Sequence, residues 1–197
     1  MIIQLEGGGV AILDQIINGN PIYLTTDNVG ASQTTNTNQL QQGGSLGLDL
    51  EGQGMTLGIW DGGAVRPTHL GVAGRVVQMD SPAANSDHGT HVAGTMMGSR
   101  DFLAGQVTGM APQAMLQAND FGDDFAEMIP QAANGLLVSN HSYGFGADNL
   151  PLYYFGAYDS ASTRLDELLY SAPFYLMVCS AGNDRGDGHN TADGGYD

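Results

Sequence analysis

The sequence predicts an α/β fold built around a mainly parallel sheet. Short apolar runs that are typical of buried strands alternate with helical segments along the chain. Polar or reactive residues follow directly after several of these runs, and the carboxyl ends of parallel strands meet at one edge of a sheet. The 197 residues include 30 glycines, which indicates many tight turns and is not typical of a helical bundle.

The first 54 residues are predicted to form an N-terminal arm that precedes the main domain. Residues 1 to about 26 alternate apolar and turn-like segments, and Ile22-Tyr23-Leu24 is expected to be a short strand. Residues 27–54 are polar and rich in glycine, which is typical of an extended surface arm or linker. We therefore expect the main domain to occupy residues 55–197.

The first part of this domain is predicted to contain two strands and a helix. Residues 55–60 form an apolar run that stops at Asp61-Gly62-Gly63, which indicates a buried strand. A second small strand is expected over residues 72–79. Small and apolar residues then follow His88, and they predict a helix over residues 88–98.

The second part continues the alternation of strands and helices. We predict strands over 114–118, 135–140 and 174–179, because each is a short apolar run bounded by turn residues. Helical patterns are expected to occupy residues 124–133 and most of residues 152–169. The tail over 184–197 is polar and shows no closing strand or helix, so the fold is expected to be incomplete at its C-terminus.

The charge balance limits the classes of partner. The chain has a net charge of −16 and five basic residues, all of them arginine. Binding to nucleic acid requires clustered Lys and Arg, so nucleic acid is not an expected partner. A saline habitat, bound cations or solubility would each explain the acidity. No stretch approaches the roughly 18–20 apolar residues of a membrane span, so no membrane partner is expected.

The single cysteine, Cys179, permits no disulfide within the chain. It lies in an apolar run, where we expect a buried structural thiol.

Three potentially reactive groups follow predicted strands or begin a helix. Asp61 ends the first strand, His88 lies at a helix start, and Asn183 follows the last strand in a turn that contains glycine. A histidine at a helix start, with small neighbours that let another backbone approach closely, suits a general base that must meet partners from distant parts of the chain.

Three motifs together resemble the subtilisin-like serine peptidases, the subtilase family or peptidase S8. The resemblance covers about residues 55 to 190, and the histidine motif is its most specific part. The motifs are Gly58-Ile59-Trp60-Asp61-Gly62-Gly63, His88-Gly89-Thr90-His91-Val92-Ala93-Gly94-Thr95 and Ser180-Ala181-Gly182-Asn183-Asp184. The resemblance implies a three-layer subtilisin-like fold and the chemistry of a serine endopeptidase.

The resemblance also implies a role for each reactive group. His88 would be the general base that takes a proton from the serine nucleophile and returns it to the leaving amine. Asp61 would hold the imidazole in the correct tautomer and stabilise its cation. Asn183 would donate its side-chain amide to the developing oxyanion.

A polypeptide substrate is expected to bind as an added β-strand. Ser142-Tyr143-Gly144 matches the family's Ser-x-Gly binding segment, and residues 122–125 roughly match the opposite binding strand. The specificity pocket would be walled by Ser142 to Gly144 and by Ser180, Ala181 and Gly182. Tyr143 is a candidate for narrowing or lining this pocket.

One departure from the family concerns the nucleophile. The family carries its serine in a Gly-Thr-Ser-x-Ala motif beyond the asparagine, and Gly-Thr-Ser occurs nowhere in these 197 residues. We therefore interpret the chain as the N-terminal part of a serine endopeptidase domain, inactive by itself. The alternative is a catalytically inactive, peptide-binding homologue.

The remaining expectations concern cofactors, assembly and location. No cofactor is required by the predicted chemistry. The acidic residues Asp184, Asp187, Asp193 and Asp197 have two alternative interpretations. They form either a structural calcium site, since calcium prefers oxygen ligands, or a solvated acidic tail. From the resemblance we expect a monomer that is secreted or extracellular, although no signal peptide is evident. Residues 1–54 are then either an N-terminal arm or a propeptide junction.

The other histidines and one serine motif receive simpler interpretations. His88 and His91 have the spacing of a zinc pair, but no third ligand of convincing spacing follows. His69 is expected to be structural, and His141 and His189 have no assigned role. Gly43-Gly44-Ser45-Leu46-Gly47 matches a nucleophile elbow without its flanking strand and helix, so we expect a surface loop.

Overall fold

The computed structural model describes residues 2–4, 10–17, 19–25, 28–101, 107–146 and 150–183. Its centre is a five-stranded sheet with the strand order β10-β9-β4-β8-β6, and all its pairings are parallel. The strands are β4 (Thr56–Asp61), β6 (Val76–Gln78), β8 (Met115–Asp120), β9 (Val138–His141) and β10 (Leu176–Cys179). The predicted α/β class and its mainly parallel sheet are confirmed.

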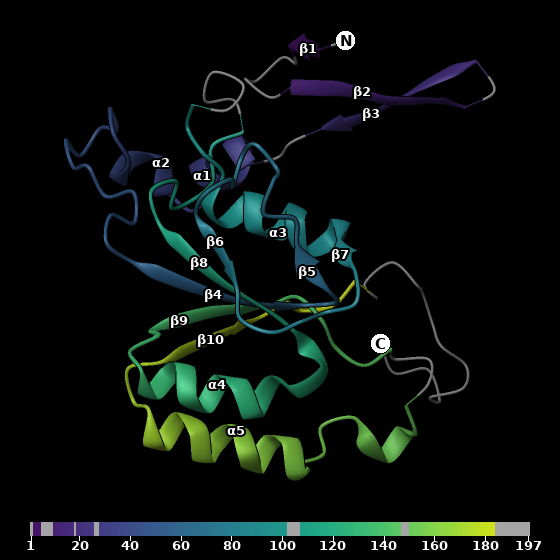
Figure 1. Ribbon diagram of the computed structural model, residues 1–197, viewed down its shortest axis with the longest axis vertical. Coiled ribbons are helices and arrows are strands. Elements are labelled where there is room, and N and C mark those ends of the chain that lie inside the picture. Colours follow the sequence, from purple (N-terminus) through teal and green to yellow (C-terminus); the bar gives the residue numbers. More distant parts are fainter. Residues whose placement is uncertain are drawn as a thin grey trace.

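Helices cover both faces of this sheet (Figure 1). Helix α3 (Asp87–Met97) lies on one face, and α4 (Asp124–Ala133) and α5 (Ser160–Ser171) lie on the other. The side chains of adjacent strand residues point to opposite faces, so Ile59 and Trp60 of β4 join different cores. The result is the three-layer arrangement that the resemblance implies.

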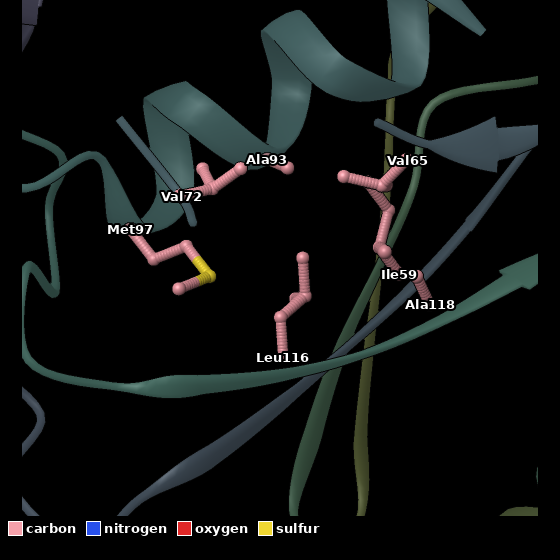
Figure 2. Packing of buried hydrophobic residues seen from close by; sticks show 7 residues of the cluster. All are labelled: Ile59, Val65, Val72, Ala93, Met97, Leu116 and Ala118. Atoms are coloured by element: carbon pink, nitrogen blue, oxygen red, sulfur yellow. The ribbon is translucent and has the colours of Figure 1, made fainter. Parts of the chain in front are cut away.

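The core beneath α3 is a cluster of small and medium aliphatic side chains. Figure 2 shows α3 contributing Ala93 and Met97, which face Leu116 of β8 and Ile59 of β4. The second core lies between the sheet and the helices α4 and α5. Its buried members are Trp60, Met128, Leu136, Leu168 and Tyr175. Together the two clusters hold β4 between the helical layers, and β4 ends in Asp61.

Shorter elements complete the described structure. An antiparallel sheet contains β1 (Ile2–Gln4), β2 (Val10–Ile17) and β3 (Asn20–Thr25). The strands β5 (Ala64–Val65) and β7 (Asn85–Ser86) pair in parallel beside α3. Two 3₁₀ turns are η2 (Phe121–Asp123) and η4 (Leu152–Tyr154). Among the described residues, no helix has both the length and the apolar character needed to cross a bilayer.

Two predicted elements are shorter than expected. The strand predicted over 72–79 covers only Val76–Gln78, because residues before it form turns, with the Arg75 amide donating to the Val72 carbonyl. The helix predicted over 152–169 begins at Ser160. Asp159 stops its extension toward the N-terminus, because Asp159 is the N-cap and accepts a hydrogen bond from the Ser162 amide.

The expectation that Cys179 is buried is wrong, because the residue is exposed. It ends β10, which pairs only with β9 among the described strands and is therefore the edge of the sheet. Partial desolvation nevertheless raises the pKa of its thiol.

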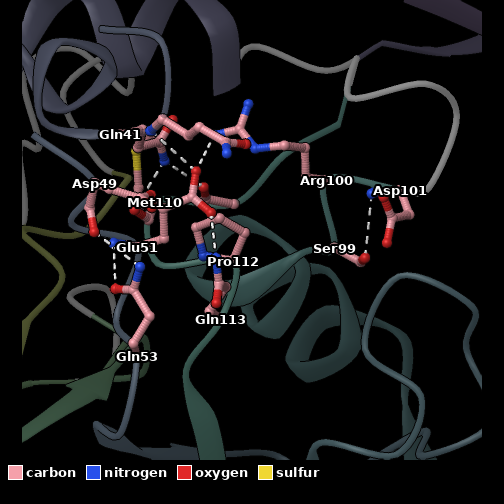
Figure 3. A network of polar contacts seen from close by, with 12 residues as sticks. Gln41, Asp49, Glu51, Gln53, Ser99, Arg100, Asp101, Met110, Pro112 and Gln113 are labelled. Carbon is pink, nitrogen blue, oxygen red and sulfur yellow. Dashed lines mark hydrogen bonds and ion pairs between the residues drawn. The ribbon is translucent and has the colours of Figure 1, made fainter. Parts of the chain in front are cut away.

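The prediction of an extended arm over residues 27–54 missed two short helices, α1 (Asn28–Thr34) and α2 (Thr37–Leu40). It also missed a polar network that fixes the end of this segment to the domain (Figure 3). Glu51 is only 2% exposed and forms an ion pair with Arg100. Its other carboxylate oxygen accepts a hydrogen bond of 2.7 Å from Gln113 Nε2. Gln41 Nε2 donates to the carbonyls of Gly109 and Met110.

Replacing Glu51 with glutamine is expected to destabilise the fold at pH 7 by about 1–2 kcal/mol, because Arg100 loses its charged partner. Burial raises the pKa of Glu51, but hydrogen bonds from Gln113, Arg100 and the Gln42 amide outweigh it, so the pKa lies below its ordinary value of 4.5. A carboxylate with a lowered pKa stabilises the fold above about pH 4.5, and this contribution is lost as the pH falls through the folded-state pKa.

Urea unfolding measured at pH 7 and at pH values below 4.5 tests this expectation. The difference between wild type and Glu51→Gln should shrink as the pH falls. Asp49→Asn is the matched control, because Asp49 is exposed and lies two residues earlier in the same segment. Equal stability of Glu51→Gln and wild type at pH 7 would contradict the role assigned to the network.

Candidate active site

The centre of the candidate site is a contact between Asp61 and His88. Nδ1 of His88 lies 2.9 Å from both carboxylate oxygens of Asp61. The Asp61 side chain is 4% exposed, whereas the His88 side chain is 61% exposed. The pair therefore consists of a buried acid and an imidazole that solvent or a ligand can reach.

The surroundings of Asp61 determine which nitrogen of His88 carries the proton. Asp61 Oδ1 also accepts hydrogen bonds from the Gly62 amide at 2.9 Å and from Ser86 Oγ at 3.3 Å. The Asp61 carboxylate can only accept hydrogen bonds. The proton of neutral His88 is then on Nδ1, and Nε2 keeps a lone pair. An imidazole held in this way can take a proton at Nε2.

The start of α3 brings His88 to the acid. Ser86 is the N-cap of the helix, and its hydroxyl accepts a hydrogen bond of 2.8 Å from the Gly89 amide. Gly89 is buried against Asp61, and a Cβ atom at this position would lie 3.1 Å from the Asp61 Cβ. The absence of a side chain at Gly89 allows the first turn of α3 to approach the end of β4.

The other predicted site segments lie at the same edge of the sheet. Trp60 of β4 is paired with His141 of β9, which is paired with Cys179 of β10. Asp61, Ser142 and Ser180 are the next residues along the three strands. The Ser180 amide also donates to the His141 carbonyl at 3.0 Å. The structure thus places the segments 142–144 and 180–182 next to one another, beyond the end of β9 and β10.

Ser180, Ala181, Gly182 and Asn183 are exposed and follow the end of β10, with Gly182 at a φ of +86°. Gly144 is exposed and Ser142 is half-buried, with its hydroxyl accepting from Asn140 Nδ2 at 2.8 Å. Asp61 and His88 are therefore in direct contact, while the other candidates share their sheet edge.

Tyr143 is the candidate for narrowing or lining the specificity pocket, and its side chain has several contacts within the protein. Its ring packs on the core beneath the sheet, and its hydroxyl donates to Asp124 Oδ2 at 2.7 Å. The same hydroxyl lies 2.9 Å from His141 Nδ1. The pKa of Tyr143 is raised, chiefly by burial and then by Asp124. The Tyr143 hydroxyl is therefore hydrogen-bonded within the protein.

His141 received no role from the sequence, yet it is one of the most buried polar residues, at 1% exposure. Its ring stacks on Trp60 with 5.1 Å between ring centroids. One sequence signal could have identified it. Ser139, His141 and Tyr143 alternate along the end of one strand, and alternate residues share a face of a sheet. Three polar side chains on the face of a buried strand indicate a hydrogen-bonded network.

The remaining expectations have mixed outcomes. Segment 43–47 consists of turns between α2 and β4, as expected for a surface loop. His91 is exposed, and no cluster of three or more His, Cys, Asp or Glu side chains able to hold a metal occurs in the part of the chain that the structure describes. His189 and the acidic residues Asp184, Asp187, Asp193 and Asp197 lie outside the described residues.

One family of known proteins matches nearly the whole chain. The model of the Subtilase family, Peptidase_S8, matches residues 7–197. None of the curated proteins searched matches the chain.

Two similar solved structures are proteases. The structure of prenylagaramide maturation protease PagA is 27% identical, with a TM-score of 0.54, over 69% of this chain and 49% of its own. The self-cleaved protease domain of PatA is 28% identical, with a TM-score of 0.51, over 68% of this chain and 52% of its own. The match thus spans about half the length of these proteins.

Proposed function

The chain belongs to the subtilase family, and from this membership we propose that it carries the acid and the base of a serine endopeptidase. The observation that carries the proposal is the contact between buried Asp61 and accessible His88, with 2.9 Å from Nδ1 to each carboxylate oxygen. Both residues lie at the carboxyl edge of a parallel sheet, where α/β proteins commonly bind ligands.

In the proposed reaction, His88 acts as the general base. Nε2 takes the proton of a serine hydroxyl while the serine oxygen bonds to the substrate carbonyl carbon. The same proton then passes to the amide nitrogen as the peptide bond breaks, which leaves an acyl-enzyme. Asp61 keeps the Nδ1 proton in place and stabilises the imidazolium formed in each step. Water then attacks the acyl carbon with His88 again as the base. The ester bond to the serine breaks, the proton passes from His88 to the serine oxygen, and the acid product leaves.

Asn183 is proposed to donate its side-chain amide to the oxygen that becomes negative. Preorganised donors of this kind stabilise the transition state, and loss of the corresponding asparagine in subtilisin costs about 10²–10³ in kcat. Asn183 is exposed after β10, so its amide is able to meet a bound substrate.

The substrate is proposed to be a polypeptide that binds in extended form. Ser142, Tyr143 and Gly144 would offer their backbone on one side, with residues 122–125 on the other. The specificity pocket would lie between Ser142–Gly144 and Ser180–Gly182, which follow paired strands. The names of the similar solved structures, both proteases, support a polypeptide substrate.

The nucleophile is proposed to lie outside the 197 residues, since they contain no Gly-Thr-Ser. By itself the chain would then not hydrolyse peptides. The same observation favours a second candidate function, that of an inactive homologue which binds peptides. We also propose that the chain is secreted or extracellular and monomeric, that it requires no cofactor, and that any calcium ion it binds is structural.

Expression of the reading frame with its downstream coding sequence tests the proposal. A longer product that contains Gly-Thr-Ser should react with a fluorophosphonate probe, and His88→Ala should abolish the reaction. A downstream sequence without a serine nucleophile, or a serine that reacts equally well without His88, would overturn it. Binding of casein by the 197-residue chain, combined with a downstream sequence that supplies no serine, would support the second candidate.

A further inference from the structure

A continuous chain of hydrogen bonds runs from Tyr175, the residue before β10, to the start of α4. Tyr175 Oη lies 2.5 Å from Ser139 Oγ, which lies 2.7 Å from His141 Nε2. On the other side of the imidazole, His141 Nδ1 lies 2.9 Å from Tyr143 Oη, which lies 2.7 Å from Asp124 Oδ2. None of these side chains belongs to the contact between Asp61 and His88.

The direction of every bond in this chain follows from its charged end. The Asp124 carboxylate accepts only, so the single proton of Tyr143 Oη is donated to it. His141 Nδ1 must then donate to the Tyr143 oxygen, which leaves Nε2 to accept from the Ser139 hydroxyl. Ser139 in turn accepts from Tyr175. In this arrangement His141 is neutral and protonated at Nδ1, and every hydroxyl proton of the chain of bonds has an acceptor within it.

Burial makes this arrangement costly to disturb. Ser139 and His141 are each 1% exposed, and one face of the imidazole is covered by Trp60. A buried polar group that loses its partner is not rescued by water. Desolvation lowers the pKa of His141 to about 4, against a raising effect of Asp124, so the ring is neutral at neutral pH.

The same chain connects two segments that are distant in the sequence. Tyr143 follows β9, whereas Asp124 begins α4 after β8, and β4 lies between β9 and β8 in the sheet. The Tyr143 ring also contacts Phe121, with 5.0 Å between ring centroids. The bond between Tyr143 and Asp124 therefore crosses the end of the strand that carries Asp61.

These two segments are the ones to which the proposed function assigns the opposite sides of the bound peptide. We propose that the bond between Tyr143 and Asp124, held by His141, is a clasp that fixes the spacing of the two peptide-binding segments. Tyr143 and His141 are then positioning residues, which act through the backbone of residues 142–144. This inference rests on the proposed function, because it assumes that a polypeptide binds between the segments.

Removing the Tyr143 hydroxyl tests the clasp in the 197-residue chain. Binding of fluorescein-labelled casein is measured by fluorescence anisotropy. We expect Tyr143→Phe to weaken binding about tenfold, since both Asp124 and His141 lose a buried partner. Tyr158→Phe is the matched control, because Tyr158 donates to Asp166 at 2.6 Å in an exposed position outside the clasp. Its affinity should equal that of wild type.

Two further measurements separate positioning from general damage. In wild type, ¹⁵N NMR should show His141 protonated at Nδ1. In Tyr143→Phe the proton should move to Nε2, because Ser139 can accept it and pass its own hydroxyl proton toward Tyr175. Asp124→Ala should reproduce the loss of affinity, whereas Asp124→Asn should retain binding. The double variant Tyr143→Phe with Asp124→Ala should bind casein no more weakly than either of its single variants.

The outcomes distinguish this inference from the function on which it rests. If wild type does not bind casein, the proposed binding of a polypeptide between the two segments is disproved, and the clasp with it. If wild type binds and Tyr143→Phe binds equally well, or His141 keeps its Nδ1 proton in that variant, the clasp alone is disproved. If Tyr143→Phe does not fold, casein affinity is compared among Asp124→Ala, His141→Gln and their double variant. Additive losses of affinity would disprove the clasp, and non-additive losses would support it.

Discussion

Replacing Asp61 with asparagine is expected to lower kcat for peptide hydrolysis by about 10⁴-fold in a form of the protein that includes the serine nucleophile. Asp61 accepts the Nδ1 proton of His88 at 2.9 Å. An asparagine amide turned toward His88 would donate instead, and its oxygen would still satisfy the Gly62 amide and Ser86. His88 would then carry its proton on Nε2, the atom that must accept the proton of the serine.

Asp87→Asn is the matched control for this experiment. It removes the same charge one residue from His88, but Asp87 is 95% exposed at its side chain and contacts Arg66. Its kcat should stay close to that of wild type, and KM for the peptide should change little in both variants. Similar kcat values for Asp61→Asn and Asp87→Asn would show that Asp61 contributes no more than surface charge.

The elements around the candidate site can be predicted from sequence because their patterns are local. The apolar run before Asp61 and the small residues after His88 specify β4 and α3 without reference to the rest of the chain. The helical pattern over 124–133 predicts α4 with the bounds that it has, Asp124–Ala133. The contact between Asp61 and His88 is expected from the family resemblance rather than from these local patterns.

The features that the sequence did not predict depend on distant contacts. Residues 28–40 show no apolar periodicity that would predict α1 and α2. Glu51, near the end of the same N-terminal segment, is bound to the domain through Arg100 and Gln113. The exposure of Cys179 depends on which strand lies beside β10, which its own apolar run does not specify. The role of His141 depends on Tyr175 and Asp124, which lie far from it along the chain.

Gly89→Ala is expected to damage both catalysis and stability, because one methyl group would enter the contact between α3 and β4. A Cβ at residue 89 would lie 3.1 Å from the Cβ and 3.2 Å from the Cγ of Asp61. Asp61 has little room to move, since its carboxylate is held by Gly62, Ser86 and His88. In a form of the protein that includes the serine nucleophile, we expect kcat to fall about 10²-fold or more. The free energy of unfolding should fall by about 1–3 kcal/mol.

Gly94→Ala on the same helix separates this steric effect from helix propensity. No atom outside the helix backbone lies within 4 Å of a Cβ built at Gly94, so this variant should gain about 0.5–1 kcal/mol in the free energy of unfolding. Urea denaturation and kcat are measured for both variants. If α3 approaches Asp61 closely, the free energy of unfolding should fall in Gly89→Ala and rise in Gly94→Ala, and kcat should fall only in Gly89→Ala. If Gly89→Ala were as stable and active as Gly94→Ala, the position of the acid would not depend on a glycine at residue 89.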